Sequence, residues 1–124
     1  MDLVIRNGML VTPGGAWRGD LGVAGGRIAA LGDGLRGARE VDAGGCIVLP
    51  GGVDPHVHLQ MPLGAYTSAD SFASGSVAAA LGGTTTVIDF VEPHPEQPFG
   101  AALAARRAQA DGAVAVDYSL HMTI

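Results

Sequence analysis

The sequence predicts an α/β protein in which a small β unit precedes the start of a parallel sheet or barrel. Short β-type runs alternate with tight-turn dipeptides up to residue 49, and strand-like and helix-like segments alternate from residue 50 onward. Alternation of strands and helices is typical of a parallel sheet, whereas closely spaced turns are typical of hairpins. We therefore divide the chain into residues 1–49 and residues 50–124.

Two hairpins are predicted in the first part. Apolar runs flank two glycine-containing dipeptides: residues 3–5 and 9–11 flank Asn7-Gly8, and residues 21–24 and 27–31 flank Gly25-Gly26. Such dipeptides favour two-residue hairpin turns, because both central residues of a type I′ turn need positive φ. Gly44-Gly45 then introduces a strand that carries Cys46, and its apolar neighbours predict a buried, inert thiol. The first part is thus predicted to be a small antiparallel β unit.

The second part is predicted to follow the order strand, helix, strand, helix, strand. Ser68 is a plausible N-cap for a helix that reaches Leu81, and Gly82-Gly83 ends it. The remaining elements are a buried strand at residues 84–91, an Ala- and Arg-rich helix at residues 99–110 and a strand at residues 113–124. A complete (β/α)₈ barrel takes about 250 residues, so about three of its eight strands are expected here. We expect the remainder of the barrel, or a partner chain, to cover the open edges.

Two histidines separated by one residue follow the strand-like run of residues 46–49, in the sequence DPHVH at residues 54–58. Side chains at i and i+2 of an extended chain share one face, so His56 and His58 are aimed at the same point. Imidazole nitrogen is a favoured zinc ligand, although such a pair can also be polar surface. Their place at the carboxyl end of a strand favours a metal site, because active sites gather there in parallel α/β proteins.

Composition excludes several function classes. The net charge is −5, the seven basic residues are all arginines, and only six residues are aromatic, which argues against a nucleic-acid partner. No apolar run reaches about 18 residues, and no basic segment precedes an apolar one at the N-terminus. The sequence therefore predicts a cytoplasmic protein without a membrane span.

Three segments together resemble the N-terminal part of the dihydropyrimidinases and D-hydantoinases, the cyclic amidases of the amidohydrolase superfamily. They are PGGVDPHVHLQ at residues 50–60, GGTTTVIDF at residues 82–90 and DYSLH at residues 117–121. The resemblance covers the whole chain. It implies the start of a TIM-like metal-dependent hydrolase barrel, preceded by part of a β-sandwich subdomain that the C-terminus completes.

The resemblance also implies a function. It implies a binuclear zinc centre with His56 and His58 as ligands, which opens the ring of a dihydropyrimidine or hydantoin to give an N-carbamoyl amino acid. The family's carboxylated lysine, later histidines and aspartate are expected beyond Ile124, and these 124 residues contain no lysine. No catalytic residue is therefore assigned within the chain. Relatives of this kind are commonly homotetramers that act in pyrimidine catabolism.

The motif suggests further site residues. Dihydroorotases resemble it but carry an arginine where Gln60 stands, and a guanidinium suits a substrate carboxylate. A neutral Gln60 favours an uncharged cyclic diamide. Leu63 is a candidate apolar contact to the substrate, with lid packing as the alternative. Asp54 and His121 are candidates for orienting the metal ligands by hydrogen bonds, without binding the metal themselves.

Two other polar residues are assigned structural roles. His94 stands between prolines and is predicted to be a solvated loop histidine. Asp89 is predicted to be structural rather than functional. Two alternatives to a hydrolase stay open: an inactive truncated remnant, and a hydantoinase-like assembly protein that has lost its metal ligands. Retention of both motif histidines argues against the second.

Overall fold

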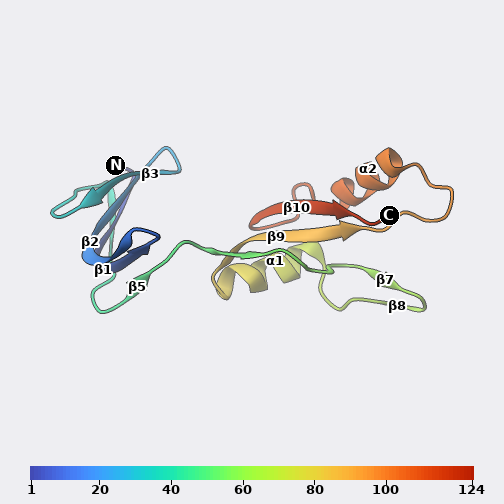
Figure 1. Ribbon diagram of the computed structural model, residues 1–124, viewed down its shortest axis with the longest axis horizontal. Coiled ribbons are helices and arrows are strands. Elements are labelled where there is room, and N and C mark those ends of the chain that lie inside the picture. Colours follow the sequence, from blue (N-terminus) through green and yellow to red (C-terminus); the bar gives the residue numbers. More distant parts are fainter. The chain divides into compact units, whose positions relative to one another are not determined.

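The computed structural model describes residues 1–124, which form two compact units, Met1–Pro50 and Gly51–Ile124 (Figure 1). The first unit is one sheet of five strands. The second combines a parallel sheet of three strands, a short hairpin and two helices. Neither helix is both long and apolar enough to cross a membrane.

The strands of the first unit form a mixed sheet. They are β1 (Leu3–Thr12), β2 (Gly15–Ala24), β3 (Arg27–Gly32), β4 (Arg39–Asp42) and β5 (Ile47–Val48). β1 pairs antiparallel with β2 and parallel with both β4 and β5, while β3 pairs antiparallel with β2. The prediction of an antiparallel unit is wrong for β4 and β5. β4 reaches β1 through the longer connection after β3, which allows the parallel direction that a two-residue turn forbids, and β5 follows β4 along the same edge of β1.

Asn7-Gly8 is a bulge inside β1 and not a hairpin turn. Asn7 has φ +60°, and the register between β1 and β2 shifts between Ile5 and Gly8. Asp20, which is buried in β2, accepts the Asn7 N–H at 2.9 Å. This hydrogen bond stabilises the left-handed residue within the strand, and it lowers the pKa of Asp20 below its usual value. The chain reverses at residues 13–14 instead.

The other glycine pairs of the first unit do form turns. Gly25 and Gly26, with φ +56° and +73°, connect β2 to β3 and confirm the second predicted hairpin. Gly45, with φ +81°, lies in a turn that the Cys46 N–H closes on the carbonyl of Ala43 at 2.9 Å. Cys46 is therefore an exposed turn residue that precedes β5, and the prediction of a buried strand thiol is wrong.

The second unit contains the predicted alternation of strands and helices, with an additional two-stranded hairpin before the first helix that was not predicted. Its elements are β6 (Gly52–Asp54), β7 (Pro62–Leu63), β8 (Tyr66–Thr67), α1 (Phe72–Leu81), β9 (Thr84–Val91), α2 (Phe99–Ala110) and β10 (Asp117–Met122). β9 lies between β6 and β10 and is parallel to both, as Figure 1 shows. The carboxyl ends of the three strands therefore lie at one edge of the sheet.

Helix α1 begins later than predicted. Its N-cap is Ser71, which forms a reciprocal capping box with Ser74. Ser68 has another partner, because its hydroxyl accepts the Met61 N–H at 2.8 Å beside the β7–β8 hairpin. The predicted end of the helix is confirmed, since Gly83 has φ +87° after the last turn.

The core between β9 and the helices contains charge as well as apolar side chains. Alternate residues of β9 are buried, and so are residues of α2 spaced four apart: Val87, Asp89, Val91, Ala102, Arg106 and Ala110. Phe72 of α1 is the largest fully buried side chain. The aspartate and the arginine lie at the end of the sheet where the histidine motif is, and both contact Leu59, the residue after His58.

Candidate metal centre

The two motif histidines lie in an extended loop at the carboxyl end of β6. Val57, between them, donates its N–H to the carbonyl of Ile88 at 3.0 Å, so the loop continues the pairing with β9. Asp54, the last residue of β6, accepts the His56 N–H at 3.1 Å. The prediction that a strand at residues 46–49 carries the motif is wrong, because β6 carries it and β5 pairs with β1.

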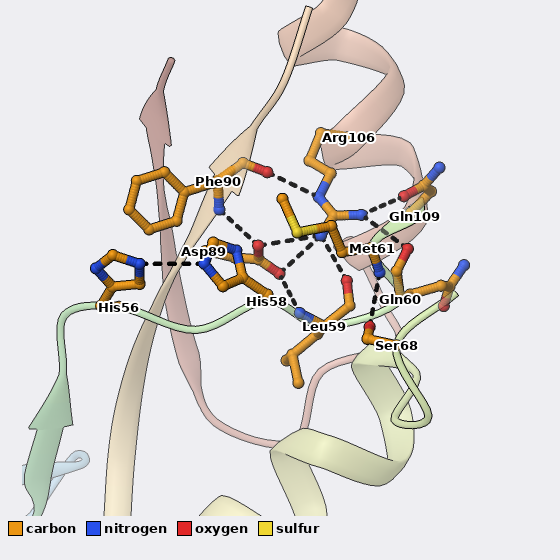
Figure 2. A network of polar contacts seen from close by, with 10 residues as sticks. All are labelled: His56, His58, Leu59, Gln60, Met61, Ser68, Asp89, Phe90, Arg106 and Gln109. Atoms are coloured by element: carbon orange, nitrogen blue, oxygen red, sulfur yellow. Dashed lines mark hydrogen bonds and ion pairs between the residues drawn. The ribbon is translucent and has the colours of Figure 1, made fainter. Parts of the chain in front are cut away.

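The imidazoles of His56 and His58 converge (Figure 2). Their Nε2 atoms are 3.1 Å apart, and the rings meet edge to face at 81°. A zinc ion about 2.0–2.1 Å from each of two nitrogens, with an angle between about 90° and tetrahedral, separates those nitrogens by about 2.9–3.4 Å. The observed separation lies in this range. The pair therefore fits two adjacent positions of a metal's coordination shell.

Phe90, at the end of β9, supports both imidazoles. Its ring centroid is 4.5 Å from that of His56 and 5.0 Å from that of His58. A third imidazole, that of His121, contacts the same phenyl ring at 5.0 Å. Aromatic contacts of this kind restrict ring rotation, so Phe90 limits the orientations available to the two histidines.

His121 lies near the end of β10, next to the start of the histidine loop. Its Nε2–H donates to the carbonyl of Pro55 at 3.1 Å, across 66 residues of sequence. Pro55 immediately precedes His56, so the bond holds the backbone of the loop and not an imidazole. Asp54 likewise contacts the loop through a backbone N–H. Their predicted influence on the metal ligands stays a prediction.

A buried ion pair lies behind the histidines. Nη2 of Arg106 is 3.0 Å and 2.9 Å from the two carboxylate oxygens of Asp89. Asp89 is fully buried and Arg106 is 8% exposed. The guanidinium also lies over the ring of Phe72, 4.5 Å from its centroid. This geometry agrees with the structural role predicted for Asp89 and gives it a partner that the sequence analysis did not name.

Gln60 and Leu63 stand farther from the imidazoles. Gln60 has φ +52°, its N–H donates to the carbonyl of Asp70 at 2.6 Å, and Figure 2 shows its side-chain amide pointing away from the histidines. Leu63 lies in β7 and is 57% exposed. A cleft of about 510 Å³ beside the hairpin is lined by its neighbours Pro62 and Gly64 but not by Leu63. Substrate contacts of Gln60 and Leu63 stay predictions.

The chain brings together two candidate metal ligands and not a complete set. No group of three or more His, Cys, Asp or Glu side chains in these 124 residues is placed to hold a metal ion. His94 is exposed, and its backbone N–H donates to the side chain of Gln97 at 3.0 Å in the loop after β9. A metal bound by His56 and His58 alone keeps water in its other positions.

We therefore expect the 124-residue chain alone to bind zinc weakly, with Kd above about 1 µM, equivalent to less than about 8 kcal/mol. Structural zinc sites with complete ligand sets reach about 10–16 kcal/mol. Isothermal titration of the monomer measures this value. His56→Ala and His58→Ala should each remove the binding, while His94→Ala should not change it. Tight binding of one zinc per monomer would contradict the expectation.

Two residues of this site were missed by the sequence analysis. Arg106 could have been found from its spacing, because it lies four residues from both Ala102 and Ala110 on the inward face of α2. A charged residue in such a stripe requires a buried partner, and Asp89 in the apolar strand was available. Phe90 gave no comparable signal, because apolar residues at strand ends are common.

Comparison with known proteins supports the predicted resemblance. Residues 47–123 match the Amidohydrolase family. The chain is 43% identical to a D-hydantoinase of Geobacillus stearothermophilus, over all of this chain and 27% of that protein. It is 40% identical to a dihydropyrimidinase of Rattus norvegicus, over 98% of this chain and 25% of that protein.

The structural comparison gives the same result. A solved D-hydantoinase from Bacillus sp. AR9 matches with a TM-score of 0.95 and 41% identity, over 99% of this chain and 27% of that one. The chain thus spans about a quarter of the length of the relatives that it matches. The chain is therefore similar to one part of these proteins in both sequence and fold.

Proposed function

Because the chain belongs to the amidohydrolase family, we propose that its protein hydrolyses a ring amide of an uncharged cyclic diamide. The substrate class is a dihydropyrimidine or a hydantoin, and the product is an N-carbamoyl amino acid. The observation that carries the proposal is the convergence of His56 and His58 at the carboxyl end of a parallel sheet, with their Nε2 atoms 3.1 Å apart. The similarity to D-hydantoinases and a dihydropyrimidinase supports the choice of substrate class.

His56 and His58 are proposed ligands of a binuclear zinc centre. When bound, zinc polarises an amide carbonyl and activates water near neutral pH. The chain's own residues prepare the ligands: Phe90 restricts both rings, and Asp54 holds the His56 N–H. We further propose that the other ligands, a carboxylated lysine among them, come from outside residues 1–124, since the chain contains no lysine.

The remaining assignments of the chain follow from the same proposal. We propose that Gly51–Ile124 begins a TIM-like barrel and that Met1–Pro50 is part of a β-sandwich subdomain. Gln60 and Leu63 are proposed to face the substrate once the barrel is complete, and His121 to steady the loop from β10. A homotetramer and a cytoplasmic location are proposed from the family resemblance.

A second candidate applies to the 124 residues on their own. With two metal ligands and no third candidate nearby, the isolated chain is proposed to be inactive. Activity then depends on the residues or the partner chain that supply the rest of the metal site. A non-enzymatic assembly role is less well supported, because both motif histidines are retained and converge.

The test is a substrate panel on the full protein that carries this sequence, loaded with zinc. Ring opening of dihydrouracil and hydantoin, followed as release of the N-carbamoyl product, is the expected result. Dihydroorotate, whose carboxylate lacks a cationic partner at Gln60, should be turned over at least about tenfold more slowly, which corresponds to about 1.4 kcal/mol. No ring opening of either diamide by a zinc-loaded protein would overturn the proposal.

A further inference from the structure

Arg106 of α2 reaches the backbone of the histidine loop, although 47 residues separate it from Leu59. We propose that Arg106 is a positioning residue that, through Asp89 and two backbone carbonyls, fixes the orientation of His56 and His58 for metal binding. The inference rests on the proposed function, because it assigns a role toward the metal held by those histidines. Arg106 itself touches neither imidazole and is not a metal ligand.

The contacts of the ion pair converge on Leu59, the residue directly after His58. Asp89 Oδ2 accepts the Leu59 N–H at 3.1 Å, and Nη2 of Arg106 donates to the Leu59 carbonyl. Both polar groups of Leu59 are thus held by the same two side chains. A residue fixed in this way restricts the backbone of its neighbour, so the Cα–Cβ direction of His58 follows from the ion pair.

The same guanidinium also fixes Phe90. Its Nε donates to the Phe90 carbonyl at 3.1 Å, and Asp89 accepts the Phe90 N–H. Phe90 supports both imidazoles with its ring, as Figure 2 shows. Arg106 therefore acts on the histidines by two routes, through the backbone after His58 and through the ring beneath both imidazoles.

Only a guanidinium can make this set of contacts. Nε, Nη1 and Nη2 of Arg106 each donate to a different group, and Nη1 bonds the side chain of Gln109 at 2.8 Å. A lysine ammonium keeps the charge but presents its three donors from one point, so it cannot span the Phe90 and Leu59 carbonyls together. Arg106→Lys therefore separates the positioning geometry from the buried charge.

The first readout is cobalt binding by the full protein, measured by chelator competition and by the visible spectrum of Co²⁺. Arg106→Lys is expected to weaken Co²⁺ binding about 10–100-fold and to alter the spectrum, as loss of an outer partner of metal ligands does. Two controls should keep wild-type affinity: Arg107→Lys, at the exposed neighbour, and Ser76→Ala, a buried change on α1 at a residue whose hydroxyl bonds Ala73 and Ala115 and no residue of the loop. Ser76→Ala separates a loss of positioning from a general loss of stability.

A milder variant keeps the inference testable if Arg106→Lys does not fold. Gln109→Leu removes the closer partner of Nη1, which also lies 3.5 Å from the Gln60 carbonyl, but leaves the Asp89–Arg106 pair intact, and Gln109 is exposed. It should weaken Co²⁺ binding several-fold. Wild-type affinity and spectrum in whichever of the two variants is folded would overturn the positioning role.

The second readout needs neither metal nor substrate. In the metal-free protein, amide hydrogen exchange at residues 57–61 should be faster in the Arg106 or Gln109 variant than in wild type and the two controls. Unchanged exchange at these residues would overturn the inference. A wild-type protein that binds Co²⁺ but opens neither ring would instead count against the proposed reaction. Failure of the positioning role and failure of the proposed function therefore give different results.

Discussion

Replacing either His56 or His58 with alanine is expected to reduce hydrolysis of dihydrouracil or hydantoin by at least about a thousandfold. The physical reason is the convergence of their Nε2 atoms, 3.1 Å apart, as ligands in two adjacent positions around one metal ion. Removing one imidazole leaves an open site in place of a ligand, whereas loss of an outer partner costs only about 10–100-fold. The measurement is kcat/KM of the zinc-loaded full protein, together with its zinc content per protomer.

His94→Ala is the matched control for this prediction. It removes an imidazole from an exposed loop of the same unit and should leave both activity and zinc content unchanged. Activity that survives both histidine substitutions and treatment with a chelator would disprove a metal mechanism. A loss of activity with full zinc content would show that the histidines act on the substrate and not on the metal.

Removing the Arg106 side chain is expected to lower the free energy of unfolding more than any other substitution proposed for this chain. Arg106→Met leaves the fully buried carboxylate of Asp89 without its cation, and breaking a buried pair in this way costs about 3–5 kcal/mol. The carbonyls of Leu59 and Phe90 lose their donors as well. The measurement is the free energy of unfolding in urea, compared with that of Arg107→Met, which should lie within about 0.5 kcal/mol of wild type.

The double variant Asp89→Leu with Arg106→Met measures how much of this loss of stability is caused by the unpaired carboxylate of Asp89. Replacing both partners of a buried pair with apolar residues is often neutral or stabilising, so the double variant should recover most of the loss. The carbonyls that Arg106 bonds stay without a donor in either variant, so recovery should be incomplete. A double variant no more stable than Arg106→Met would show that these backbone bonds, and not the carboxylate, make Arg106 necessary.

Much of the second unit could be predicted because its local signals agree with its tertiary structure. The predicted strand at residues 84–91 and helix at residues 99–110 coincide with β9 and α2. A run of threonines and valine favours a strand, and an alanine-rich segment that ends at an aspartate and a glycine favours a helix of that length. Glycine pairs end α1 and connect β2 to β3 because glycine readily adopts the positive φ that both positions require.

The errors occur where distant residues override a local signal. Asn7-Gly8 is a strong hairpin signal, yet the bond from Asn7 to Asp20 of the neighbouring strand turns it into a bulge. Ser68 is a good N-cap by type, but its hydroxyl is taken by the Met61 N–H of the hairpin. Neither partner is identifiable before the pairing of strands is known.

Only the part of the candidate site that depends on the spacing of residues within the histidine motif could be predicted. The spacing of His56 and His58, with one residue between them, sets their common direction, so the motif alone was enough to predict convergence. The support beneath them could not be predicted in the same way. Phe90 and Arg106 act across 30 to 50 residues of sequence. The contacts of Phe90 depend on how the loop pairs with β9, and those of Arg106 on how α2 packs on β9.

The hydrogen bond from His121 to the carbonyl of Pro55 has a consequence for biosynthesis. The two residues are 66 positions apart, and a ribosome adds about 5–20 residues per second. The histidine loop therefore waits several seconds after its own synthesis before β10 exists to hold it. During this interval the carbonyl of Pro55 lacks its donor, so zinc that arrives before β10 is complete meets a loop held by fewer contacts than in the folded protein.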